Sequence, residues 1–187
     1  MDLLRLGLRQ PDRRSCGAAT LVMARMLQDE AYAGRVLAAD AFSAEALAMH
    51  RRVTGVVDVT GRLQPPWPRA LGTPPWATAR QLAWTARTPY DVRLVPPWDR
   101  ERGLAGLRAG VATGLPVALY VGSPTLPRHV VLAAAGPRDG LRAWEPSSGR
   151  LTTLDEEAFV AGRLRGLGWP VPWLVVAPTP PARRTGA

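Results

Sequence analysis

The sequence predicts an α+β fold in which N-terminal helices pack against an antiparallel sheet built from the C-terminal half of the chain. Most segments with the periodicity of amphipathic helices lie within residues 1–113, whereas short apolar, strand-like runs separated by turns follow one another from residue 114 to 177. Helices that precede a set of strands are typical of the α+β class. A chain of 187 residues can bury one core and is too short for two ordinary domains.

Four helices are predicted in the first part of the chain. Ser15 stands where an N-cap residue would, and the good helix formers after it predict a buried helix over 16–27 that packs on the sheet. The other three helices are expected over 40–52, 76–87 and 100–113. Residues 56–75 are rich in Pro and Gly and are expected to form a loop, and 90–95 alternates like a short strand.

The second part of the chain is predicted to supply the sheet. Strand-like runs cover 116–121, 129–135, 141–145 and 172–177. The second and third runs flank the sequence 136–140, Gly-Pro-Arg-Asp-Gly, which predicts a hairpin turn. Thr153 and Glu156 have the spacing of a capping box for a helix that ends at Arg165. We expect one domain over 1–177 and a disordered tail over 178–187.

Composition limits the classes of function. The net charge of +9 comes from 24 basic residues, all arginine and spread along the chain, and no nucleic-acid-binding motif accompanies them. We therefore expect a solvated arginine surface and no nucleic-acid partner. No apolar run approaches the roughly 18 residues of a membrane span, and no secretion signal is recognisable, so a cytoplasmic location is expected unless export needs no signal. A single cysteine excludes an internal disulfide and a cysteine zinc cluster.

A Pro-Pro-Trp motif occurs three times. The copies lie at 65–67, 74–76 and 96–98. Each copy places an indole on a stiff, extended segment, where it would either anchor a loop on the core or line a substrate groove. Anchoring is the simpler expectation.

The cysteine lies at the predicted start of the first helix. The positive end of the helix dipole favours the thiolate form of Cys16 at this position. Gly17 and Ala18 are small enough to leave the approach to the sulfur open. Gln10, six residues earlier, would place its amide beside the backbone N–H of Cys16, and the two donors would form an oxyanion hole.

A nucleophilic thiolate also needs a base, and the chain offers two histidines. His50 falls within the predicted helix 40–52 beside two arginines, where a solvated surface position is expected. His129 opens a predicted strand, and an imidazole at the edge of the sheet could face the start of the first helix. We therefore expect His129 to be the base.

A catalytic base is commonly oriented by a third group. Asp139 lies in the predicted hairpin turn and is explained by that turn. Glu145 ends the following strand, so an antiparallel pairing would bring it beside His129. The alternative for Glu145 is a strand-end carboxylate that faces solvent.

The segment from Gln10 through Cys16 to Met23 resembles the nucleophile segment of the papain-like peptidases that process bacteriocin leaders, and of their stand-alone bacterial relatives. The resemblance continues, in order, through 114–119, 128–132, 144–149 and the helix near Phe159.

This resemblance implies a papain-like fold and a thiol peptidase that uses no metal and no cofactor. It implies that Cys16 is the nucleophile, His129 the base, Gln10 the oxyanion donor and Glu145 the orienting residue. The family usually has aspartate at the position of Glu145. The chain also lacks the transporter segments of the leader-processing members, so cleavage after a double-glycine leader does not follow.

The predicted function is therefore a cysteine-dependent hydrolase, in the first place a peptidase that acts on a peptide or protein through a Cys16 acyl-enzyme. A deamidase or amide transferase with the same catalytic groups is the nearest alternative. A papain-like binding module without catalysis is a second one, and an arginine-rich nucleic-acid binder is a third. The sequence specifies neither the substrate nor the oligomeric state.

Overall fold

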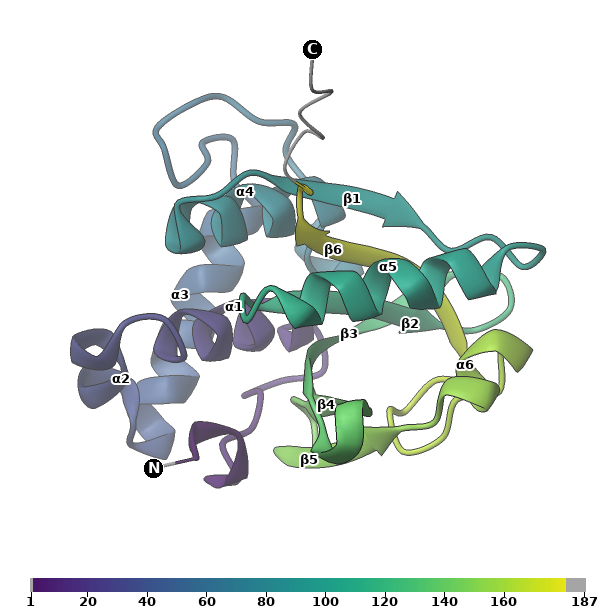
Figure 1. Cartoon of the computed structure of the whole chain (residues 1–187). Helices are drawn as coiled ribbons and strands as arrows, with labels where there is room; N and C mark the ends of the chain where they lie inside the picture. The colour runs from purple at the N-terminus through teal and green to yellow at the C-terminus, as the bar shows by residue number, and fades with distance from the viewer. Residues whose placement is uncertain (1, 181–187) are drawn as a thin grey trace, which may run out of the picture.

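A six-stranded antiparallel sheet separates two layers of helices (Figure 1). The structure is a computed structural model that describes residues 2–180. Its strands are β1 (Tyr90–Leu94), β2 (Val117–Gly122), β3 (Pro127–Ala135), β4 (Leu141–Glu145), β5 (Arg150–Leu154) and β6 (Val171–Pro178). Their order in the sheet is β1-β6-β2-β3-β4-β5, and every neighbouring pair is antiparallel.

The helices are α1 (Cys16–Met26), α2 (Glu30–Val36), α3 (Ala39–Thr54), α4 (Pro75–Ala86), α5 (Arg100–Ala112) and α6 (Glu156–Ala161). Short 3₁₀ turns lie at η1 (Leu3–Arg5), η2 (Arg69–Leu71) and η3 (Pro137–Asp139). Helices α1 to α4 lie on one side of the sheet and α5 and α6 on the other, and a separate apolar core fills each side. Within β2, Tyr120 faces the first core and Leu119 the second, so this strand is apolar on both faces.

Helix α1 is buried along its length between the sheet and α3. The hydroxyl of Thr20 donates a hydrogen bond to the backbone oxygen of Val130 in β3 over 3.2 Å. Cys16 lies one helical turn before Thr20, and His129 directly precedes Val130. This hydrogen bond therefore brings the start of α1 to the start of β3.

The predicted α+β class is confirmed, and so are the helices expected over 16–27, 40–52, 76–87 and 100–113, each to within a few residues. Helix α2 and strand β5 were not predicted. The predicted capping box was wrong, because Thr153 pairs with Arg142 inside β5. Asp155 caps α6 instead, accepting from the N–H of Ala158 over 3.0 Å, and the helix ends before Gly162. The predicted tail lies outside the described residues from 181 onward, whereas Pro178 still belongs to β6.

The predicted loop 56–75 is anchored on the helical layer. The indoles of Trp67 and Trp76 pack edge to face at 5.1 Å, so two of the Pro-Pro-Trp motifs hold the loop as expected. Trp98, in the third motif, is 86% exposed and anchors nothing. The amide of Gln64 donates to the backbone oxygens of Arg52 and Gly55, which ties the loop to the end of α3.

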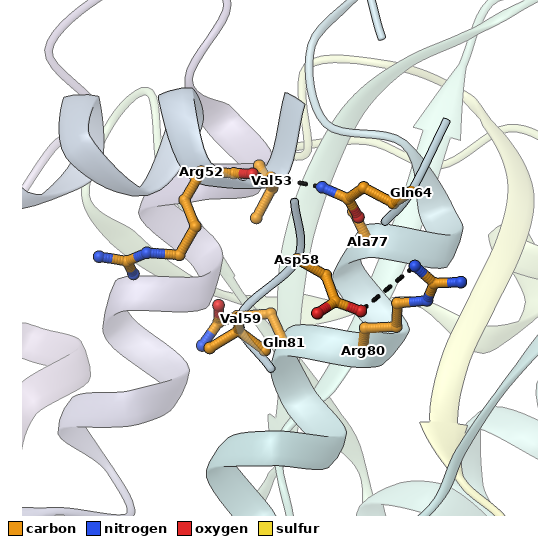
Figure 2. Close-up of a pocket in the computed structure, with 8 residues that line it drawn as sticks. All are labelled: Arg52, Val53, Asp58, Val59, Gln64, Ala77, Arg80 and Gln81. Carbon is orange, nitrogen blue, oxygen red and sulfur yellow. Dashed lines mark hydrogen bonds and ion pairs between the residues drawn. The ribbon is translucent and has the colours of Figure 1, made fainter. Parts of the chain in front are cut away.

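A small cavity of about 10 Å³ lies beneath this loop, between α3 and α4, and Figure 2 shows the side chains that line it. Both side-chain amide atoms of Gln81 are buried there and find no hydrogen-bond partner in the described part of the chain, and the same holds for the Oε1 of Gln64. A polar space of this size holds one water molecule and no substrate. Within residues 2–180, no helix has both the length and the apolar composition needed to cross a membrane.

Candidate active site

His129 and Glu145 meet at the ends of two neighbouring strands. The Nε2 atom of His129, near the start of β3, lies 2.7 Å from the Oε1 atom of Glu145, the last residue of β4. Both side chains are buried, with 8% and 4% of their surface exposed. The antiparallel pairing of β3 with β4 produces this contact, because it returns the chain to the start of β3. Glu145 is therefore not a strand-end carboxylate that faces solvent.

The turn that follows β4 fixes the Glu145 carboxylate. Its Oε1 accepts from the backbone N–H of Ser147, and its Oε2 accepts from the Ser147 hydroxyl and the Ser148 N–H, each over 2.8 Å. Gly149 closes the turn with a positive φ of 67°, and a Cβ there would lie 2.5 Å from the backbone oxygen of Leu8. Only glycine adopts this φ without strain and has no Cβ to collide with the backbone of Leu8. The turn thus holds the carboxylate and packs against the N-terminal segment.

Cys16 is the first residue of α1, and the start of this helix lacks a cap. Ser15 occupies the N-cap position, but its hydroxyl lies 3.5 Å from the backbone oxygen of Asp12 and caps no helical N–H. Within residues 2–180, no side chain accepts from the N–H of Cys16, Gly17 or Ala18. Free N–H groups at a helix start provide a site for negative charge, here directly beside the thiol.

The interactions of His129 favour its charged form. Burial by itself lowers the pKa of His129, but Cys16 and Glu145 together outweigh burial and raise the pKa to about 9. Burial would likewise raise the pKa of Glu145, yet hydrogen bonds from His129, Ser148 and Ser147 lower it well below its usual range. Because Nε2 is bonded to Glu145, Nδ1 is the nitrogen that remains for Cys16. The side chain of Cys16 is near enough to interact with the imidazole and to raise its pKa.

Gln10 lies in the segment before α1, as expected, but its amide already has a partner. Its Nε2 donates to the backbone oxygen of Asp12 over 2.5 Å, and its backbone N–H donates to the oxygen of Pro146 over 2.8 Å. The second bond joins this segment to the turn after Glu145. An amide nitrogen carries two protons, so one N–H of Gln10 remains without a partner among residues 2–180.

One expectation about a neighbouring residue was wrong. His50 is not a solvated surface residue: it is 6% exposed, and its Nε2 has no hydrogen-bond partner within residues 2–180. Burial, aided by the nearby Arg69, lowers the pKa of His50, although Asp12 opposes this shift. Gly17 leaves room for the side chain of Thr73. A Cβ at position 17 would lie 2.6 Å from the Cβ of Thr73.

A group of hydroxyl residues near Cys16 escaped the sequence analysis. The hydroxyl of Tyr120 donates to the backbone oxygen of Thr73 over 2.9 Å and lies 2.7 Å from the Thr78 hydroxyl. Burial raises the pKa of Tyr120. Thr73 also lies against Gly17, the residue after Cys16, so this group borders the start of α1. Nothing in the local sequence distinguishes this tyrosine from an ordinary core residue of a strand.

A second hollow lies away from this site. A surface hollow of about 310 Å³ lies between β1 and α5, lined in part by Arg93, Leu94 and Arg102, and thus in the layer opposite α1. The described residues contain no group of three or more His, Cys, Asp and Glu side chains arranged to hold a metal ion.

Comparison of the chain with family models, with curated proteins and with solved structures finds no significant match. Membership of the papain-like family therefore stays a prediction.

Proposed function

We propose that this protein is a cysteine-dependent hydrolase, in the first place a peptidase, with Cys16 as nucleophile and His129 as base. The observation that carries the proposal is the buried hydrogen bond between His129 Nε2 and Glu145 Oε1 beside a cysteine at an uncapped helix start. Glu145 selects the tautomer and stabilises the imidazolium, and the helix start offers N–H groups to an anion.

In the proposed reaction, the Cys16 thiolate attacks the carbonyl carbon of an amide, and the carbonyl oxygen becomes an oxyanion. The backbone N–H of Cys16 and the free N–H of Gln10 donate to this oxygen. The His129 imidazolium protonates the leaving amine, the C–N bond breaks and a thioester remains on Cys16. His129 then removes a proton from water, which attacks the thioester and releases the acid and the thiolate.

Thiol reactivity tests the first requirement of this mechanism. Wild-type protein should react with iodoacetamide at pH 6 at least tenfold faster than free cysteine and faster than the same protein unfolded by heat. Cys16→Ser should abolish labelling, and His129→Ala should slow it to the rate of an ordinary thiol. A rate in the folded state no greater than that of free cysteine would exclude Cys16 as an activated nucleophile.

Product analysis tests the reaction class. Incubation with a mixture of unstructured peptides should yield new N-termini, detected by mass spectrometry, that disappear in Cys16→Ser. Release of ammonia without new N-termini would instead indicate deamidation, which the same acyl-enzyme permits with a side-chain carboxamide. A reactive Cys16 without either product would favour a binding module with this fold.

A further inference from the structure

An oxyanion hole requires donors that are held in place before the reaction, because donors that must be ordered during the reaction stabilise the transition state less. Gln10 is a partly exposed side chain on an irregular segment, and Cys16 follows an N-cap residue that does not cap. Both candidate donors therefore depend on the segment between them, residues 11–15, for their position.

Asp12 makes the hydrogen bonds that fix this segment. Its Oδ1 accepts from the backbone N–H of Arg14 over 2.8 Å and of Ser15 over 2.9 Å. These two bonds close the turn that leads directly into Cys16. Although burial would raise the pKa of Asp12, these bonds lower it, so the carboxylate is charged at neutral pH.

The same residue also holds the Gln10 amide. The backbone oxygen of Asp12 accepts from Gln10 Nε2 over 2.5 Å, and the turn closed by the Asp12 side chain sets the direction of that oxygen. The turn uses the N–H groups of Arg14 and Ser15, whereas the N–H of Cys16 has no acceptor within the described part of the chain. One side chain thus constrains both donors without occupying either of them.

We propose that Asp12 is a positioning residue for the oxyanion hole, an inference that rests on the function proposed above. Its carboxylate fixes the 12–15 turn, and this turn directs the Gln10 amide and the Cys16 N–H toward the same oxygen. It has no part in the activation of the thiol, which depends on His129 and Glu145. Substitution of Asp12 should therefore weaken the stabilisation of the transition state and leave the reactivity of the thiol nearly unchanged.

Two reactions of Cys16 distinguish these effects. Alkylation by iodoacetamide requires a thiolate and forms no oxyanion. The Cys16 thiolate adds to the aldehyde carbon of the N-acetylated dipeptide aldehyde of alanine, so the S–C bond forms and the C=O π bond opens. The former carbonyl oxygen occupies the oxyanion hole and becomes the hydroxyl of a hemithioacetal when the His129 imidazolium gives it a proton. In Asp12→Ala, we expect an alkylation rate within about threefold of wild type and an aldehyde affinity lower by about 10- to 100-fold.

Matched variants complete the experiment. Asp12→Asn keeps an acceptor for Arg14 and Ser15 and should bind the aldehyde within about fivefold of wild type. Gln10→Ala removes one of the two donors and should lower the aldehyde affinity no more than Asp12→Ala does. The double variant should be little worse than Asp12→Ala, because Asp12→Ala already leaves the Gln10 amide unpositioned. Asp155→Ala removes a similar hydrogen bond at the start of α6, on the opposite layer, and should leave both reactions unchanged.

If Asp12→Ala leaves the aldehyde affinity unchanged, the positioning role of Asp12 is wrong, but the proposed hydrolase function is not affected. A parallel loss of alkylation and aldehyde binding in this variant would also overturn it, because the whole site would then be disordered. If wild-type protein shows neither rapid alkylation nor an aldehyde adduct, the proposed hydrolase function itself is wrong.

Discussion

Glu145 is the most constrained side chain of the candidate site. Its two carboxylate oxygens receive four hydrogen bonds, one from His129 and three from the turn at Ser147 and Ser148. The turn fixes the position of the carboxylate, and the length of the side chain sets how far it reaches toward the imidazole. A substitution at this position therefore changes either the charge or the reach of the side chain.

Glu145→Gln should lower the hydrolysis rate by about 10- to 100-fold and slow alkylation of Cys16 at pH 6. The amide carries no charge, so the pKa of His129 falls and the resting ion pair loses stability. Glu145→Asp should be worse than wild type, because a carboxylate one methylene shorter cannot reach both His129 and the turn, and misplacement of about 1 Å can cost around a hundredfold. The pH profiles of alkylation and hydrolysis measure both effects. Unchanged profiles in both variants would leave a Cys16–His129 dyad without Glu145.

The two histidines should respond differently to substitution. His129→Ala should abolish hydrolysis. It should lower the free energy of unfolding by little more than the contribution of the hydrogen bond between His129 and Glu145. His50→Ala should leave the nucleophile reactive but lower the free energy of unfolding by about 1–3 kcal/mol, because it removes a buried ring from α3. Chemical denaturation measured alongside alkylation tests this pair. If His50→Ala is as stable as wild type, the buried imidazole contributes nothing to the free energy of unfolding.

At the scale of elements, the start of α1 is enclosed by segments that are distant in the sequence. The turn after β4 contacts it through Gln10, and the segment before α4 contacts it through Thr73. Gly17 permits the second contact because it has no side chain. Cys16 is therefore positioned by packing between elements as well as by the helix itself.

Gly17→Ala should lower the free energy of unfolding by about 1–3 kcal/mol, because the new methyl group overlaps the Cβ of Thr73. Thr73→Gly should reduce this penalty in a double-mutant cycle monitored by denaturant unfolding. Gly34→Ala provides the control, since Gly34 lies within α2 and a Cβ there meets nothing within 4 Å. This control should be neutral or slightly stabilising. Equal effects of the two glycine substitutions would contradict the proposed overlap.

At the scale of the whole molecule, the two histidines make stability depend on pH in opposite directions. The pKa of His129 is raised from 6.5 to about 9, so its proton stabilises the folded state. This contribution is complete below pH 6.5 and is lost as the pH rises through 9. The pKa of His50 is lowered, so the unfolded state binds the proton more tightly, and stability falls as the pH drops below 6.5.

The thermal midpoint should therefore be highest near pH 6.5 to 7 and fall by roughly 5 °C as the pH is raised to 9. The chain has no lysine, so few groups besides the histidines change charge in this range. His129→Gln should flatten the basic side of the profile, and His50→Gln the acidic side. Thermal unfolding in buffers of constant ionic strength measures both. If the thermal midpoint of His129→Gln falls between pH 7 and 9 as much as that of wild type, the raised pKa of His129 is contradicted.

Local patterns in the sequence determined most elements of this protein. Helical periodicity and the apolar run after Ser15 placed Cys16 at a helix start, and the turn signal at 136–140 predicted the β3–β4 hairpin. Local patterns also have a limit, because one pattern can suit two structures. The spacing of Thr153 and Glu156 fits a capping box, but Thr153 was drawn into β5 by its pairing with β4.

Only the tertiary structure decided how the residues of the candidate site are arranged. The contact between His129 and Glu145 depends on strand pairing and on a turn that orients the carboxylate. The burial of His50 and the contact of Thr73 with Gly17 depend on how a long loop folds back over α1 and α3. Such contacts join residues far apart in the chain, and their free energy comes from burial and hydrogen bonding between elements, which no local sequence pattern records.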